Sequence, residues 1–278
     1  MVSETGMRVE RVTSANETAV LAYLERAPYE NVYLSDLIRN DRSASARNGL
    51  FAAVDSGRIE GAASFGRQIV LAAAPRAVPA LAELAHRRRG ERMIVGPRAA
   101  VIAFWNLVRD GRPAPRLVRE RQFVMAVDVG RLKRADGTIR VRMARAQDAG
   151  ETVNASAQMI EHELEYDPRR TSPEFASGVR AMIERERWWV GEIDGGRLCF
   201  FCSIGPSSKK TAQLQGIWVP PELRGRGYAT AALSAICARL LESRPSLSLY
   251  VNDFNEPAIA LYRRVGFEHV ADFQTLLF

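Results

Sequence analysis

The turn Arg224-Gly225-Arg226-Gly227 combines residue types and spacing that could bind a phosphate group. Two prolines end the apolar run before it, and an alanine-rich helical pattern starts at Tyr228 directly after it. Glycines let an anion approach the backbone, and the free N–H groups of a helix N-terminus favour negative charge. The turn lacks the Gly-Lys-Ser/Thr of a Walker loop and the third glycine of the dinucleotide fingerprint. We therefore expect a phosphate site of another kind.

A nucleic-acid contact is the main alternative for the same turn. The chain has 39 basic and 32 acidic residues, and its net charge of +7 permits binding to a polyanion. The basic residues are scattered, however, and the turn has neither interleaved aromatic residues nor a helical basic stripe beside it. We do not expect nucleic acid as a partner.

A second polar group follows in the segment Leu249–Phe267, which reads LYVNDFNEPAIALYRRVGF. Asn255 stands where it can cap a helix that starts at Glu256. Tyr262 comes seven residues after Asn255, which is two helical turns, so both side chains lie on one side of the helix.

Both segments resemble the GNAT acetyltransferase superfamily. Val219–Leu233 is similar to the acyl-CoA loop of that superfamily, whose Arg/Gln-x-x-Gly-x-Gly/Ala pattern is matched by Arg224, Gly227 and Ala229. Leu249–Phe267 resembles its strand, Asn-capped helix and Tyr-x-x-x-Gly-Phe signature. The likeness covers the second half of the chain in the expected order. The layout also looks like a bacterial tandem-GNAT family whose first half is divergent and has no assigned function.

The resemblance implies acetyl-CoA as the acyl donor. The backbone from Arg224 onward would hold its pyrophosphate, and the strand edge Ile217–Val219 would hydrogen-bond its pantetheine as an added strand does. Asn255 would contact the cofactor or would only cap its helix. Tyr262 would protonate the departing thiolate or would only pack in the core. The implied cofactor-binding residues are Ile217, Trp218, Val219, Arg224, Gly225, Arg226, Gly227, Tyr228, Ala229, Thr230, Asn255 and Tyr262.

The general base is harder to place. An amine must be neutral to attack a thioester, so a base or a water chain to one is expected. Gln213 and Gln215 share a strand face with Ile217, where some GNAT enzymes carry a glutamate, and we expect them to contact the acceptor. Glutamine cannot take up a proton, so this departure implies either a lower activity or a base at another position.

The acidic segment Glu161–Pro168 is the best replacement, since in GNAT proteins this region borders the acceptor site. We expect Glu163 and Tyr166 to contact the acceptor and Glu163 to act in catalysis. The alternative is a solvated charged helix face.

Two pairs of similar sequence segments indicate the strands and helices that position these residues. The segment at Arg8 resembles the one at Arg140, and the hairpin pattern Leu50–Phe65 resembles Trp188–Ser203. They predict a duplicated fold, although strand-helix-hairpin openings can also look alike by chance. The polar segment Val129–Arg140 then marks the boundary.

The fold class that follows is α/β (α+β), with two tandem GNAT-like domains, each a mixed central sheet flanked by helices. Residues 1–134 form a divergent domain without an acyl-CoA loop, because Arg67–Leu84 lacks the glycine pattern. Residues 135–278 form the acetyltransferase domain. We expect the first domain to supply a wall of the acceptor cleft or a surface for a homodimer.

Composition narrows the remaining possibilities. No apolar run suits a membrane span or a signal peptide, so we expect a cytoplasmic protein. Three cysteines argue against a disulfide framework. Cys199 and Cys202 fall three apart on an expected buried strand, where they would point to opposite faces, and we predict no metal site.

The sequence thus predicts an N-acetyltransferase that passes an acetyl group from acetyl-CoA directly to a primary amine. The amine belongs to a small molecule or a peptide that the sequence does not identify, and a longer acyl-CoA is also compatible with the motif. The alternative is a non-catalytic protein that binds acyl-CoA or has a regulatory role.

Overall fold

The two halves of the chain repeat one order of strands and helices, as the sequence predicts. The computed structural model describes residues 6–41, 43, 48–88, 90–135, 137 and 139–278. The first half contains β1 (Arg8–Arg11), α1 (Glu17–Leu24), α2 (Val32–Asn40), β2 (Leu50–Asp55), β3 (Arg58–Ser64), β4 (Gln68–Ala73), α4 (Val78–His86), β5 (Met93–Pro97), α5 (Arg98–Val108) and β6 (Leu117–Asp128).

The second half begins at β7 and follows the same plan. It contains β7 (Arg140–Met143), α6 (Ala149–Leu164), α7 (Pro168–Thr171), α8 (Phe175–Glu184), β8 (Trp188–Glu192), β9 (Leu198–Ser207), β10 (Ala212–Trp218), α9 (Tyr228–Leu241), β11 (Ser246–Asn252), α10 (Glu256–Val265) and β12 (Glu268–Leu277).

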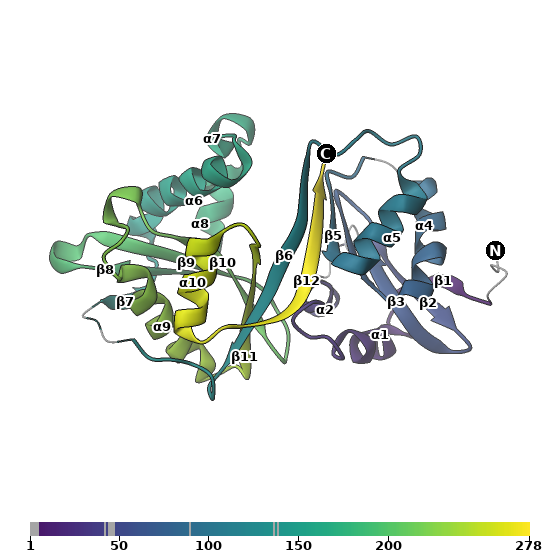
Figure 1. Cartoon of the computed structure of the whole chain (residues 1–278), viewed down its shortest axis with the longest axis horizontal. Coiled ribbons are helices and arrows are strands. Elements are labelled where there is room, and N and C mark those ends of the chain that lie inside the picture. The colour runs from purple at the N-terminus through teal and green to yellow at the C-terminus, as the bar shows by residue number, and fades with distance from the viewer. Residues whose placement is uncertain (1–5, 42, 44–47, 89, 136, 138) are drawn as a thin grey trace.

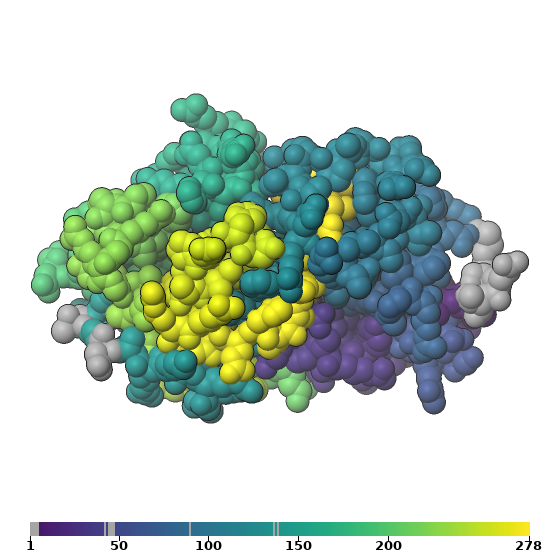
Figure 2. Space-filling view, in the orientation of Figure 1, coloured from purple at the N-terminus to yellow at the C-terminus, as the bar shows by residue number. Residues whose placement is uncertain are grey.

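The last strand of each half is shared between the halves. Among the described residues one 12-stranded mixed sheet runs in the order β1-β2-β3-β4-β5-β12-β6-β11-β10-β9-β8-β7. Strand β12 lies between β5 and β6 of the first half, with Leu276 opposite Ile94, and β6 pairs with β11, with Tyr250 opposite Val124. Figures 1 and 2 show β12 lying along the middle of the molecule, between the two halves. The two expected central sheets are therefore one continuous sheet.

Helices cover both faces of this sheet because each has an apolar side. Buried residues of α9 and α10 pack on one face of the second half, and those of α6 and α8 pack on the other. In the first half, α4 and α5 cover one face and α1 and α2 cover the other. The result is a three-layer arrangement with the sheet as its middle layer (Figure 1).

The two cysteines of β9 do not point to opposite faces, so that expectation is wrong. Leu198 pairs with Glu192 and Phe200 with Gly191, which leaves Cys199 as the extra residue of a β-bulge. The bulge places Cys199 and Cys202 in the same apolar cluster, under α9. Both are buried side chains of the core, and burial raises the pKa of each thiol.

Strands β10 and β11 separate soon after they begin. They pair in parallel only at Ala212 with Leu247 and at Gln213 with Ser248. Gly216, whose φ of 62° is in the left-handed region, then interrupts the pairing of β10 with β9. The diverging strands leave an opening in the middle of the second half.

Candidate functional site

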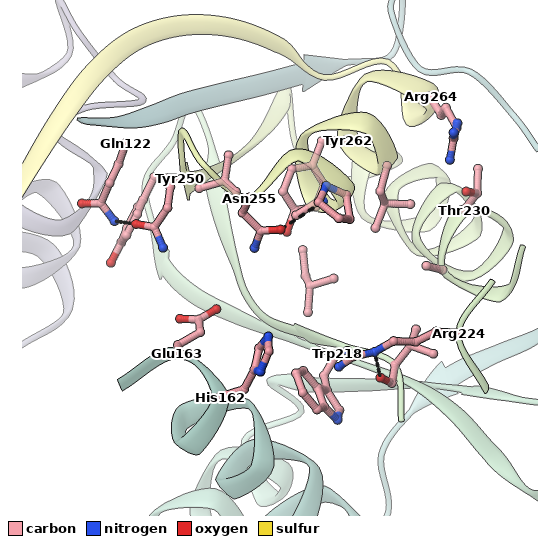
Figure 3. A pocket seen from close by; sticks show the side chains of 18 of the residues that line it. Gln122, His162, Glu163, Trp218, Arg224, Thr230, Tyr250, Asn255, Tyr262 and Arg264 are labelled. Atoms are coloured by element: carbon pink, nitrogen blue, oxygen red, sulfur yellow. Dashed lines mark hydrogen bonds between the residues drawn. The ribbon is translucent and has the colours of Figure 1, made fainter. Parts of the chain in front are cut away.

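A cavity of about 640 Å³ occupies the opening between β10 and β11. Its walls come from the end of α6, the loop before α9, helix α10 and strands β6 and β12. Figure 3 shows its labelled side chains in three groups: Gln122, Glu163 and Tyr250 at one end, Asn255 and Tyr262 in the middle, and Arg224, Thr230 and Arg264 at the other end. All twelve cofactor-binding residues predicted from the sequence line this cavity.

The loop before α9 has the backbone of an anion site. Gly225 and Gly227 have φ angles of 74° and 81°, which side chains other than glycine rarely adopt. A Cβ atom at either position would meet no atom within 4 Å, so the backbone borders open space. No described residue accepts a hydrogen bond from the backbone N–H groups from Gly225 to Thr230. These groups and the N-terminus of α9 can bind a phosphate together.

Arg224 holds the loop rather than pointing into open space. Its Nε donates to the backbone oxygen of Val219 at 3.0 Å, and its guanidinium lies over the Trp218 ring, 4.4 Å from the centroid. The His162 ring contacts the same indole, with centroids 5.9 Å apart. Arg226 and Arg264, which also line this end of the cavity, carry the positive charge that remains exposed.

The edge of β10 that faces β11 is free after Gln213. Since the two strands pair no further, the backbone groups on this edge of Ile217–Val219 have no strand partner in β11. An extended, amide-containing ligand could pair with this edge as a short added strand.

Asn255 and Tyr262 lie between the two ends of the cavity, as the two-turn spacing predicts. The Asn255 side-chain oxygen accepts from the Ala258 backbone N–H at 3.3 Å, so this residue does cap α10. The Tyr262 ring packs against Phe267 and is only 8% exposed, while its hydroxyl bonds to no described residue. Burial raises the pKa of Tyr262 well above its usual range, so the phenol remains protonated.

Glu163, in the last turn of α6, lines the opposite end of the cavity. Surrounding protein atoms raise the pKa of its carboxyl, and the nearby charges of Arg119 and His162 oppose that rise. The residue as a whole is exposed to solvent. A carboxylate of this kind takes up a proton more readily than one on the open surface.

Three predicted acceptor residues do not line the cavity. Gln215 donates through Nε2 to the Gln213 side-chain oxygen at 3.0 Å. The bulge at Gly216 explains their position, because it breaks the alternation that would place both with Ile217. Tyr166 is 38% exposed and follows Glu165, whose left-handed conformation ends α6.

Strands β6, β11 and β12 contribute cavity residues that sequence reasoning missed. Gln122 donates to the Asn252 side-chain oxygen at 3.1 Å and accepts from the Thr275 hydroxyl at 2.6 Å. Arg119 donates through Nη2 to the backbone oxygen of Glu163 at 2.6 Å. Arg119 and Gln122 come from the first half, which therefore does line the cavity. No local motif marks them, since strand exchange alone brings β6 to this place.

The described part of the chain has neither a candidate metal cluster nor a candidate membrane span. No group of three or more His, Cys, Asp or Glu residues there could hold a metal ion. No helix there is long and apolar enough to cross a membrane.

Comparison with known proteins places both halves in families. Residues 156–267 match the acetyltransferase (GNAT) family, and residues 49–151 match a domain of unknown function, DUF4081. The second match crosses the expected boundary between residues 134 and 135, which stays a prediction.

Solved structures with the same fold cover nearly the whole chain. A Drosophila protein is 14% identical, with a TM-score of 0.68 over 97% of this chain and 98% of its own. A GCN5-related N-acetyltransferase from Sphaerobacter thermophilus is 16% identical, with a TM-score of 0.59 over 99% and 96%. A tandem GNAT protein from the clavulanic acid biosynthesis pathway is 15% identical, with a TM-score of 0.56 over 98% of each chain.

The family matches, the shared fold and the order of elements agree with one another. The second half of the chain is a GNAT-family domain, and it is joined to a DUF4081 domain in a tandem GNAT fold.

Proposed function

We propose that this protein is an N-acetyltransferase that passes an acetyl group from acetyl-CoA directly to a primary amine. The observation that carries the proposal is the cavity itself. It joins a phosphate-type loop at one end, a protonated tyrosine in the middle and a carboxylate at the other end. The loop would bind the acyl donor, the tyrosine would protonate the leaving thiolate, and the carboxylate would face the acceptor amine.

The loop and the strand edge fit the donor. The N–H groups from Gly225 to Thr230 would hold the pyrophosphate, and the free edge of Ile217–Val219 would bind the pantetheine. The Asn255 oxygen is engaged in its cap, so only its amide NH₂ is available to a ligand. Acetyl-CoA, when bound, supplies an acetyl group already activated as a thioester.

The corresponding region of the first half is closed. Strands β4 and β5 pair in parallel from Gln68 to Val70. Beyond that pairing, a Cβ atom at Gly96 would lie only 2.6 Å from the Leu71 backbone oxygen. The backbones are thus in contact where β10 and β11 separate, which supports a single donor site, in the second half.

Tyr262 and Glu163 divide the proton chemistry. The Tyr262 hydroxyl holds a proton at neutral pH and can release it to a leaving thiolate. Glu163, whose pKa is raised by its surroundings, can receive the proton of an incoming amine. The amine must lose its proton before its lone pair can attack, so Glu163 acts before Tyr262.

One observation favours the alternative, a protein that binds acyl-CoA without catalysis. Strand β10 presents no carboxylate to the cavity, and Gln213 and Gln215 bond to each other instead. The alternative then requires that Glu163 takes no part in proton transfer.

Release of free thiol from acetyl-CoA, measured with a panel of primary amines, tests the proposal. We expect at least one class of amine to raise the rate of thiol release above the rate measured without any amine. Binding of acetyl-CoA with no amine-dependent release from any member would refute the enzyme proposal and favour the binding protein.

A further inference from the structure

Arg119 is a buried cation that forms no ion pair with any described residue. The residue is 8% exposed and lines the cavity from β6. Its Nη2 donates to a backbone oxygen, that of Glu163, and its guanidinium lies 5.7 Å from the centroid of the Phe254 ring. No carboxylate of the described residues forms an ion pair with it. Burying a guanidinium without an ion-pair partner costs free energy, so a negatively charged ligand would bind there favourably.

The Glu163 carboxylate lies in the same part of the cavity and is also unpaired. No described residue donates a hydrogen bond to it, and it forms no ion pair there. The Arg119 bond to the backbone of Glu163 places the two residues side by side. The Arg119 charge is close enough to lower the pKa of the Glu163 carboxyl, although the two charged groups form no ion pair. This end of the cavity therefore presents one cation and one anion to the same open space.

Three other polar groups at this end, those of Gln122, Asn252 and Thr275, bond to one another. Gln122 bonds to both Asn252 and Thr275. These groups offer dipoles to a ligand but no net charge. Arg119 and Glu163 are thus two opposite charges that an acceptor would meet at this end.

We infer that the acceptor is an amine that carries its own carboxylate, an amino acid being the simplest member of this class. The inference rests on the proposed function. The planar guanidinium of Arg119 suits a carboxylate because it can donate two parallel hydrogen bonds. Glu163 would receive the ammonium group and hold it toward Tyr262. The donor's phosphates are not the better match for Arg119, because Arg119 bonds to Glu163. Figure 3 shows Glu163 at the opposite end of the cavity from Arg224 of the phosphate-type loop.

The step balances in atoms and protons. The amine nitrogen forms the new bond to the acetyl carbon as the C–S bond of the thioester breaks. The ammonium gives up two protons in all. One passes through Glu163 to water. The other replaces the proton that Tyr262 donates to the thiolate. The carboxylate of the acceptor is unchanged, so Arg119 acts in recognition alone.

Matched pairs of acceptors test this inference. Thiol release is measured with amino acids and with the same amino acids as carboxamides, which keep the amine and lose the negative charge. For the best amino acid we expect kcat/KM to exceed that of its amide by about 100-fold, because the amide leaves the buried cation unpaired. Arg119→Gln should reduce this ratio to below about 5, mainly through KM, and Arg119→Lys should keep part of it.

Arg121→Gln is the matched control. Arg121 is on the same strand, but its side chain is 46% exposed and pairs with Asp272 outside the cavity lining. This variant should keep the full preference for the acid. Arg119→Gln should keep its acetyl-CoA affinity within about 2-fold and a melting curve that shows a folded protein.

Several results would overturn the inference. These are equal use of acid and amide by the unchanged protein, an equal loss for both in Arg119→Gln, or an acetyl-CoA affinity that falls together with the selectivity. If simple amines are acetylated as well as amino acids, the inference alone fails. If acetyl-CoA binds and no amine is acetylated, the proposed function is wrong, and the inference that depends on it is wrong too.

Discussion

Replacing Tyr262 with phenylalanine removes one oxygen from the middle of the cavity and little else. The ring contact with Phe267, at 6.0 Å between centroids, can remain, since phenylalanine has the same shape. The hydroxyl bonds to no described residue, so its removal leaves no partner unsatisfied there. We therefore expect the free energy of unfolding to change by less than about 1 kcal/mol.

The effect on the reaction should be much larger. A positioned general acid contributes about 10²-fold to 10⁴-fold to a rate. A loss of 10²-fold corresponds to about 2.7 kcal/mol in the activation barrier. We expect kcat for Tyr262→Phe to fall by at least about 100-fold, with acetyl-CoA affinity nearly unchanged. Burial raises the pKa of the phenol, so Tyr262 should keep its proton at every pH up to 10. Over that range, kcat of the unchanged protein should not decline through loss of this proton.

Thiol release at saturating acetyl-CoA, with calorimetry for binding, measures both quantities. Tyr23→Phe is the control, since the Tyr23 hydroxyl donates to the Glu60 backbone oxygen in the first half. That variant should lose some stability and no activity. A Tyr262→Phe enzyme with the kcat of the unchanged protein would refute the role of Tyr262 as acid and leave it a packing residue.

Two other substitutions give separate checks. Since the pKa of Glu163 lies above its ordinary value of 4.5, kcat/KM should fall as the pH drops through that raised pKa and the carboxylate takes up a proton. Glu163→Gln should lower kcat/KM by about 10- to 100-fold and abolish this acidic limb, and a variant that keeps the limb would exclude Glu163 as the base. Gly266→Ala should lower the free energy of unfolding by about 2–4 kcal/mol in urea titrations, because φ is 104° and the new Cβ would lie 2.1 Å from the Arg131 backbone oxygen. Gly57→Ala, with φ of 80° and open space around it, should cost only about 1 kcal/mol, so equal losses would contradict this account.

The loop end of the cavity could be predicted because its signals are local. Two prolines and two glycines set the loop, and α9 begins at Tyr228 as the pattern indicates. The Asn255 cap and the position of Tyr262 follow from spacing along one helix. In each case the residues that decide the conformation are a few positions apart.

The end of the cavity that contains Arg119 and Glu163 could not be predicted in the same way. Arg119 reaches the cavity because β6 pairs with β11 and β12, more than a hundred residues later in the chain. One left-handed glycine, Gly216, moves Gln213 and Gln215 out of the face that simple alternation assigns to them. Non-local pairing and a single bulge leave no mark in the spacing of polar residues.

We propose that the loop before α9 binds the donor for transfer to an amine. This role of the loop is tested most directly by the rate at which acetylated amine forms, followed by mass spectrometry, in the unchanged protein and in Gly227→Glu. The new side chain places bulk and negative charge where the phosphates would lie, so we expect acetyl-CoA-dependent product from the unchanged protein and a loss of at least about 100-fold in the variant. Equal rates in the two proteins, or no acetylated amine from either, would contradict the claim.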